Sequence, residues 1–142
     1  MKHKIFVYGT LKDGFRNRHV NTGTRLPGEF VTLEEFPLYI IGNRYLPWLL
    51  NQAGQGFQVV GQVFEVSDAA LAKMDVLERI NEPDWYVRET IQVLPRNDVD
   101  AEPISCFVYF GSLYGLQLET VHEGPVQEYT AEHASWFEAI SA

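Results

Sequence analysis

Glu78 is the residue in this sequence whose type and position best suit chemistry. Residues 69–79 are predicted to form a helix, and a helix turns by about 100° per residue. On that wheel Glu78 falls between Leu71 and Met74, on the face that meets the core. A carboxylate there is paired with a cation, hydrogen-bonded, or desolvated with a raised pKa. The desolvated case describes a general acid or base near neutral pH; the alternative is a side chain that reaches solvent and caps a neighbour.

The other residue types that carry chemistry are less well placed. Asp75, one turn before Glu78, is interpreted as a surface or structural residue. Cys106 lies in the middle of a predicted strand, which favours a core position over a nucleophile. The four histidines, which lack the spacing of metal ligands, are His3, His19, His122 and His133. The sequence therefore predicts no metal site.

Three large side chains are candidates for the surroundings of Glu78. Tyr86 and Arg88 alternate on one face of the strand predicted after the helix. They either orient a carboxylate or are ordinary cross-strand neighbours. Trp48 lies in an apolar segment, where it either fills the core or forms the wall of a pocket.

The opening stretch is predicted to be a buried strand that ends in a glycine turn. Residues 5–8 are β-branched or aromatic, and Gly9 and Gly14 follow. Because glycine lacks a Cβ, the backbone after Tyr8 can approach another group closely. The N–H groups of Thr10, Leu11 and Lys12 can then face a small anion, although an ordinary turn explains the pattern equally well. The spacing is not that of a phosphate-binding loop.

Length and composition favour one folded domain over residues 1–142, without metal or disulfide support. The chain is 46% hydrophobic, and its single cysteine excludes an internal disulfide. A net charge of −8 without a cluster of basic residues makes nucleic acid an improbable partner. No stretch resembles a signal-peptide core or is long enough to cross a bilayer. We therefore expect a protein of the cytoplasm, away from the membrane; the oligomeric state stays open.

The pattern of apolar residues predicts an α+β fold, a small mixed β-barrel flanked by helices. Strands are expected at residues 28–33, 36–41, 57–66, 85–94 and 104–110, after the opening strand. Gly61 is a candidate bulge. Residues 43–52 are expected to be a loop and residues 111–125 to be irregular. Thr130 is expected to cap a final amphipathic helix that carries Ala134, Phe137 and Ile140.

The motifs together resemble one known family. Residues 7–12, with Gly14 and Asn17 after them, resemble the signature loop of the γ-glutamylcyclotransferase-like family, and most of all its γ-glutamylamine cyclotransferase branch. Further segments follow in the order of that branch, namely residues 47–50, 61–66, 74–78, 86–88 and 106–109. The loop, the helix glutamate and the Tyr-x-Arg pair make the resemblance specific. The stretch after Gly111 does not resemble the branch clearly.

The resemblance implies a β-barrel enzyme that cleaves γ-glutamyl amides without water and without a cofactor. The α-amine of the small-molecule γ-glutamyl substrate would attack its own γ-carbonyl, giving 5-oxoproline and a free amine. Glu78 matches the catalytic glutamate of the family. The implied substrate-binding residues are Tyr8, Gly9, Thr10, Leu11, Trp48, Tyr86 and Arg88.

Two alternatives to the γ-glutamylamine reaction stay open at this point. One is a cyclotransferase for γ-glutamyl amino acids or peptides. Residues 47–50 favour the γ-glutamylamine branch over it, but only by resemblance. The other is a non-catalytic module that binds a small ligand on the same barrel. A buried carboxylate without a use argues against that module, because its desolvation is costly.

Overall fold

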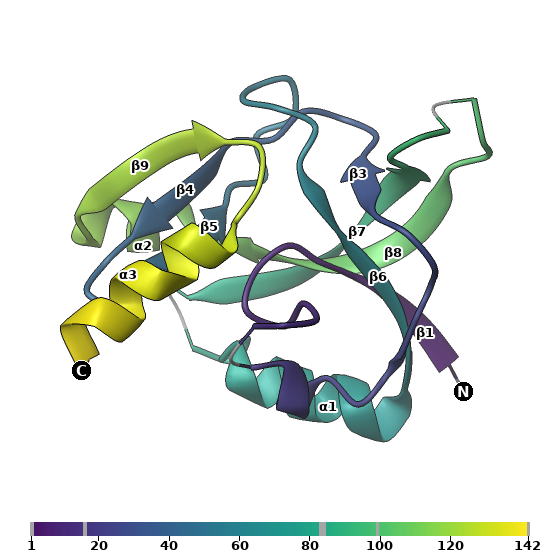
Figure 1. The fold of residues 1–142 in the computed structure, drawn as a ribbon, viewed down its shortest axis with the longest axis horizontal. Helices are drawn as coiled ribbons and strands as arrows, with labels where there is room; N and C mark the ends of the chain where they lie inside the picture. Colours follow the sequence, from purple (N-terminus) through teal and green to yellow (C-terminus); the bar gives the residue numbers. More distant parts are fainter. Residues whose placement is uncertain (1, 16, 83–84, 99, 142) are drawn as a thin grey trace.

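The computed structural model describes residues 2–15, 17–82, 85–98 and 100–141, without the side chains of residues 118 and 137–141. In these residues the chain forms a curled sheet, with a second, smaller sheet at one end and helices around both (Figure 1). This confirms the predicted α+β class and the barrel-like core with flanking helices. The predicted inward positions Phe137 and Ile140 lie outside the described side chains.

The curled sheet turns back on itself. Its strands are β1 (Lys2–Val7), β2 (Thr24–Arg25), β3 (Phe30–Thr32), β6 (Val60–Ser67), β7 (Tyr86–Pro95) and β8 (Ile104–Gly111). Their order is β1-β8-β7-β3-β6-β2, and β1 also pairs antiparallel with β6, so the pairings run round a ring. The parallel contact of β1 with β8 rests on one register pair, Ile5 with Phe107. The sheet is therefore barrel-like, with one sparsely paired side.

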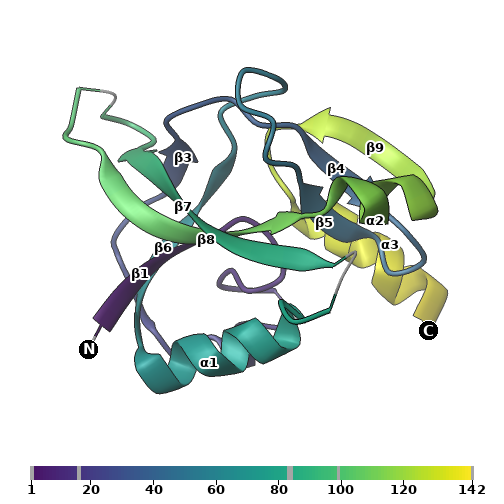
Figure 2. The same ribbon diagram turned by 180° about the vertical axis from the view of Figure 1, so that it is seen from behind.

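Alternate residues of β1 separate the two main parts of the core. Phe6 and Tyr8 pack among apolar side chains of β3, β6, β7 and β8. Ile5 and Val7 point the other way, into a second cluster that includes Met74. Because successive strand residues face opposite sides, β1 binds both layers at once. Figure 2 shows the helix that carries Met74 lying along the outside of the curled sheet.

That helix, α1 (Asp68–Leu77), is two residues shorter at its end than predicted. Ser67 caps its start, accepting a hydrogen bond from the backbone N–H of Ala70 at 3.1 Å. At its end Glu78 is the C-cap, and Arg79 has a φ of +53°. The N–H of Arg79 donates to Val76 and that of Ile80 to Asp75, the Schellman pattern in which glycine is usual at the left-handed position. Without a glycine there, the sequence gives no signal for this end.

The second sheet contains two of the segments that were predicted incorrectly. Its order is β5-β4-β9, with β4 at Leu38–Ile41, β5 at Leu46–Leu49 and β9 at Val121–Val126. Residues 46–49 belong to the stretch 43–52 that was expected to be a loop, and Pro47 lies among them. Proline is tolerated here because β5 is an edge strand, paired only with β4 among the described residues.

Residues 111–125 were expected to be irregular. They form α2 (Leu113–Leu118) and most of β9. The register of β9 against β4 shifts twice, between Leu38 and Ile41, which hides the alternation of a regular strand. Gly124 has a φ of +139°, a backbone conformation that favours glycine. The remaining elements are a 3₁₀ turn, η1 (Arg18–Val20), and the C-terminal helix α3 (Ala131–Ser141), which follows Thr130 as predicted.

Two strand glycines mark places where the layers lie very close. Gly61 is not the predicted bulge: it stands in regular register opposite Phe30, and a Cβ there would lie 2.5 Å from the carbonyl oxygen of Val7. Gly111, at the end of β8, lies against the ring of Trp48, where a Cβ would lie 2.3 Å from the indole. The absence of a side chain at each position allows this packing.

We expect Gly111→Ala to lower the free energy of unfolding by about 1–3 kcal/mol, because the added methyl must displace the buried Trp48 ring. Urea denaturation measures the loss. Ser105→Ala, at an exposed position of the same strand, is the matched control and should stay within about 0.5 kcal/mol of the parent. A Gly111→Ala protein as stable as the parent would contradict the close packing described here.

Candidate active site

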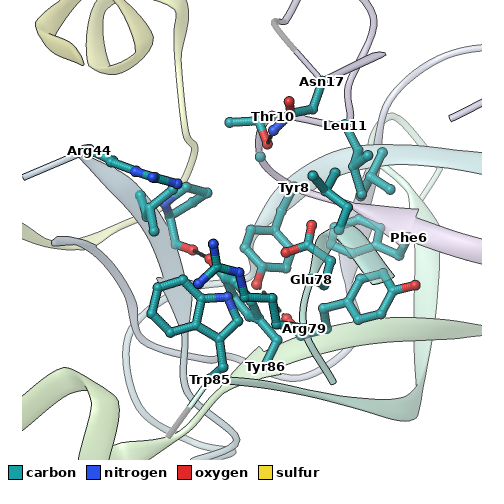
Figure 3. Close-up of a pocket in the computed structure, with 16 residues that line it drawn as sticks. Phe6, Tyr8, Thr10, Leu11, Asn17, Arg44, Glu78, Arg79, Trp85 and Tyr86 are labelled. Atoms are coloured by element: carbon teal, nitrogen blue, oxygen red, sulfur yellow. Dashed lines mark hydrogen bonds between the residues drawn. The ribbon is translucent and has the colours of Figure 1, made fainter. Parts of the chain in front are cut away.

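A cavity of about 280 Å³ opens where the loop after β1, the end of α1, the β4–β5 turn and the start of β7 meet. Figure 3 shows Glu78 in its centre, pointing toward Tyr8 and Thr10. We call it the inner cavity. Its lining residues are Phe6, Val7, Tyr8, Gly9, Thr10, Leu11, Asn17, Arg44, Leu46, Pro47, Leu77, Glu78, Arg79, Trp85, Tyr86 and Tyr109.

The Glu78 carboxyl is the one acidic group on the wall of this cavity among the described residues. The residue is half-buried, and no group in the described part of the chain hydrogen-bonds or ion-pairs with its carboxyl. Burial raises the pKa of Glu78 to about 8. Its place at the C-terminus of α1, where the helix dipole is negative, also disfavours the charged form. Glu78 is thus a carboxyl group that exchanges a proton near neutral pH.

Two tyrosines connect this cavity to the helix behind it. The hydroxyl of Tyr8 donates a hydrogen bond to the carbonyl of Tyr109, and the hydroxyl of Tyr109 donates to Asp75 Oδ1 at 2.7 Å. Burial, and then the charge of Glu78, raise the pKa of Tyr8 well above its usual value. Both tyrosines therefore stay protonated beside Glu78, and each hydroxyl proton is already donated, to the Tyr109 carbonyl and to Asp75.

Arg88 does not line the inner cavity. Its guanidinium pairs with Asp75 Oδ2 and lies over the ring of Phe107, 4.7 Å from the centroid. Asp75 has the structural role expected of it, because it holds Arg88 and Tyr109 together. Of the two interpretations of Arg88, the structure supports the one in which its side chain orients a carboxylate. That carboxylate belongs to Asp75 and not to Glu78.

The loop after β1 contributes Gly9, Thr10 and Leu11 to the cavity wall. The N–H of Lys12, expected to face an anion, instead donates to the carbonyl of Gly9 at 3.1 Å and closes a tight turn. Asn17 fixes the same turn, because its Nδ2 donates to Thr10 Oγ1 at 2.9 Å. Gly9 is required for packing: a Cβ there would lie 2.4 Å from the ring of Pro47.

Lys12 holds this loop against the C-terminal segment. Its side chain is almost fully buried, and its Nζ donates to the carbonyl of Tyr129 at 2.6 Å. The ammonium also lies 4.5 Å from the centre of the Phe15 ring, and burial lowers its pKa. The shape of this loop therefore depends on a contact with Tyr129, a residue far away in the sequence.

Trp48 and Tyr86 lie side by side, with ring centres 4.5 Å apart. Tyr86 lines the inner cavity, and its hydroxyl donates to the carbonyl of Pro47 at 2.6 Å. Trp48 is buried, and its Nε1 donates to the carbonyl of Ser112 at 2.8 Å. Trp48 lines an adjoining cavity instead. The residue thus both fills the core and forms the wall of a pocket.

Sequence reasoning missed three residues at the mouth of the cavity, Arg44, Arg79 and Trp85. The guanidinium of Arg79 lies over Trp85 at 5.1 Å, and its Nε is 3.6 Å from Glu82. Arg79 could have been found as the direct neighbour of Glu78. Arg44 lies on the turn between β4 and β5, and no sequence pattern marks it.

In the described part of the chain, no three His, Cys, Asp or Glu side chains come together in a way that could hold a metal ion. None of its helices has the length and apolar character needed to cross a membrane.

The sequence is similar to those of one protein family. The family model "Gamma-glutamyl cyclotransferase, AIG2-like" matches residues 5–136. The chain is 37% identical over 119 residues to gamma-glutamylaminecyclotransferase of Mus musculus, which covers 78% of each protein. It is 35% identical over 133 residues to the protein of that name from Bos taurus, covering 90% of this chain and 76% of the bovine one.

Solved structures agree with the sequence match. The crystal structure of an AIG2-like protein from Mus musculus superposes with a TM-score of 0.73 at 32% identity, covering 92% of this chain and 90% of the other. The family match continues past Gly111, where the sequence motifs fade. The barrel-like fold, the matched residues and the relatives lead to one conclusion: the chain belongs to the gamma-glutamyl cyclotransferase, AIG2-like family.

Proposed function

We propose that this chain is a γ-glutamylamine cyclotransferase, which converts a γ-glutamyl amine into 5-oxoproline and a free amine. The observation that carries the proposal is the Glu78 carboxyl, held in the inner cavity without a partner in the described part of the chain and with a pKa of about 8. The name shared by the mouse and bovine relatives supports the same reaction. We infer that one cytoplasmic domain, residues 1–142, does this without a cofactor.

Glu78 would act first as a general base. The substrate's α-ammonium has no lone pair, so the Glu78 carboxylate must take one proton before the nitrogen can attack the γ-carbonyl carbon. A base with a pKa of about 8 is matched to an ammonium group far better than an ordinary carboxylate is. Attack forms the new C–N bond of the five-membered ring and a tetrahedral oxyanion.

The same carboxyl would then act as a general acid. Collapse of the oxyanion breaks the bond between the γ-carbon and the departing nitrogen, and Glu78 returns its proton to that nitrogen. The ring nitrogen still carries a second proton, which passes to the released amine, so the products are a neutral lactam and an ammonium ion. Atoms balance without water: one substrate gives 5-oxoproline and one amine. Orienting the amine against the carbonyl within the cavity removes an entropic barrier worth about 7 kcal/mol or more when the alignment is ideal.

The remaining wall residues would hold the substrate. We assign the backbone of Gly9, Thr10 and Leu11 to the α-carboxylate or the oxyanion, since these residues line the cavity opposite Glu78. Tyr8 and Tyr86 shape the space for the bent glutamyl group. Arg88 would act only as a positioning residue, through its contact with Asp75.

A second candidate is a cyclotransferase for γ-glutamyl amino acids or peptides. Arg44 and Arg79 at the mouth favour it, because a leaving group of that kind has a carboxylate one carbon from the departing nitrogen. The names of the relatives favour the amine reaction instead. A non-catalytic module is less consistent with an unpaired carboxyl kept in a cavity.

We expect the purified protein to release 5-oxoproline and lysine from γ-glutamyl-ε-lysine, detected by chromatography. The matched control is the same compound acetylated on the α-amine of its glutamyl group, which cannot cyclise and should stay intact. Release of glutamate in place of 5-oxoproline would show hydrolysis and contradict the cyclisation mechanism.

Glu78→Gln keeps the size of the side chain and removes its proton exchange, so kcat should fall about 10²–10⁴-fold while substrate still binds. Steady-state kinetics and calorimetric binding measure the two effects separately. Glu89→Gln, an exposed carboxylate on β7 that lines no described cavity, controls for the change in net charge. Full turnover in Glu78→Gln would exclude Glu78 as the base.

The raised pKa of Glu78 also predicts how stability depends on pH. Between its ordinary value of 4.5 and about 8, the folded protein holds a proton that the unfolded chain has lost. The parent should therefore lose up to about 1.4 kcal/mol of unfolding free energy per pH unit in that range, relative to Glu78→Gln. Urea denaturation of both proteins at pH 5, 6, 7 and 8 measures this. Parallel curves would mean that Glu78 titrates normally.

A further inference from the structure

A second cavity of about 320 Å³ adjoins the inner one, and we call it the outer cavity. Arg44, Leu46, Arg79 and Trp85 line both, so the two share a boundary. Figure 3 shows Arg44, Arg79 and Trp85 together on one side of Glu78. A substrate whose glutamyl part fills the inner cavity can therefore extend its other half across this boundary. The residues found only on the outer cavity are Ile41, Gly42, Asn43, Trp48, Gly115 and Glu119.

The walls of the outer cavity suit an alkyl chain. Ile41, Leu46, Trp48 and Trp85 present aliphatic or aromatic surface, and the Trp48 and Trp85 rings meet edge to face with centres 5.5 Å apart. Such surface gains free energy when it covers methylene groups. The two indoles are held by neighbouring elements, so the wall exists before a ligand arrives.

Glu119 is the one acidic side chain on the outer cavity among the described residues. It follows α2, and the N–H of Gly42 donates to the carbonyl of the next residue, Thr120, at 2.9 Å. The carboxyl lies over Gly42, where an added Cβ would be 3.3 Å from Oε2. No cation in the described part of the chain pairs with it.

The charges that line the two cavities alternate in sign from the inner to the outer one. Glu78 lies on the inner cavity alone, Arg44 on both, and Glu119 on the outer cavity alone. Arg79 also lies on both, but its guanidinium is already paired with Glu82 and stacked on Trp85. A ligand that complements this order has an ammonium, then a carboxylate, then a second cation beyond an apolar stem.

We propose that the outer cavity binds the leaving-group half of the substrate, and that Glu119 selects amines whose alkyl chain ends in a second cationic group. This rests on the proposed function, because that reaction supplies the amine. The glutamyl α-ammonium faces Glu78 and its α-carboxylate lies toward Arg44, which leaves the loop backbone after Tyr8 to the oxyanion. The distal ammonium of the leaving group reaches Glu119. A leaving group without a distal cation would be indifferent to Glu119.

Two matched substrates test the proposal, the γ-glutamyl amide of 5-aminopentylamine and the γ-glutamyl amide of pentylamine. They share the stem and differ only in the terminal ammonium. The parent should favour the charged amide in kcat/KM, and Glu119→Gln should reduce that preference about two- to fivefold, the range of an exposed ion pair. The reduction should shrink at high salt. Glu89→Gln, remote from both cavities, should keep the parental preference.

A binding measurement makes the test independent of turnover. Calorimetry with Glu78→Gln, and with the double variant Glu78→Gln/Glu119→Gln, gives the affinity of both intact amides. The affinity for the charged amide should fall in the double variant, relative to the neutral amide. Equal charged-to-neutral ratios with and without Glu119 would overturn the proposal. If neither amide gives 5-oxoproline, the proposed function fails, and the affinity ratios still decide the role of Glu119.

Discussion

The Glu78 carboxyl must stay in a cavity where no group in the described part of the chain pairs with it, and the local fold is arranged around that unfavourable placement. Met74, one turn earlier, is fully buried and fixes the helix against the sheet. Arg79 then takes a left-handed conformation, which costs about 1 kcal/mol or more for a residue other than glycine. The chain turns away directly after Glu78, so the carboxyl remains at the edge of the packed layer. The unpaired Glu78 carboxyl and the left-handed Arg79 both lower the stability of the fold, and both lie at the group that exchanges protons.

The fold class and much of the site could be predicted because their signals are local. The β-branched and aromatic run at residues 5–8 is a pattern of a few adjacent residues. So is the spacing of Leu71, Met74 and Glu78, which led to the prediction that Glu78 faces inward. The glycine turn after Tyr8 could likewise be predicted from Gly9 and Gly14, although the contact that requires Gly9, with Pro47, could not. Local patterns and tertiary packing agree in this half of the molecule.

The rest was hidden because it depends on contacts between distant segments. Pro47 lies in a strand, which is possible because β5 is an edge, and which strand is an edge is set by the fold and not by the local sequence. The partner of Arg88 is Asp75, and no pattern in the strand says which carboxylate it meets. Arg44 and Glu119 come from a turn and from the end of a short helix, so only the fold brings them to the same cavity.

The contact between Lys12 and Tyr129 bears on the order in which the sheet and the loop after β1 form during synthesis. These residues are 117 positions apart, and closing so long a segment is entropically unfavourable until other contacts support it. During synthesis, β1 can pair with β6 long before Tyr129 has left the ribosome. The nascent protein can thus pair β1 with β6 while the loop around Thr10 still lacks its contact with Tyr129, and that loop is fixed in place only after Tyr129 has emerged.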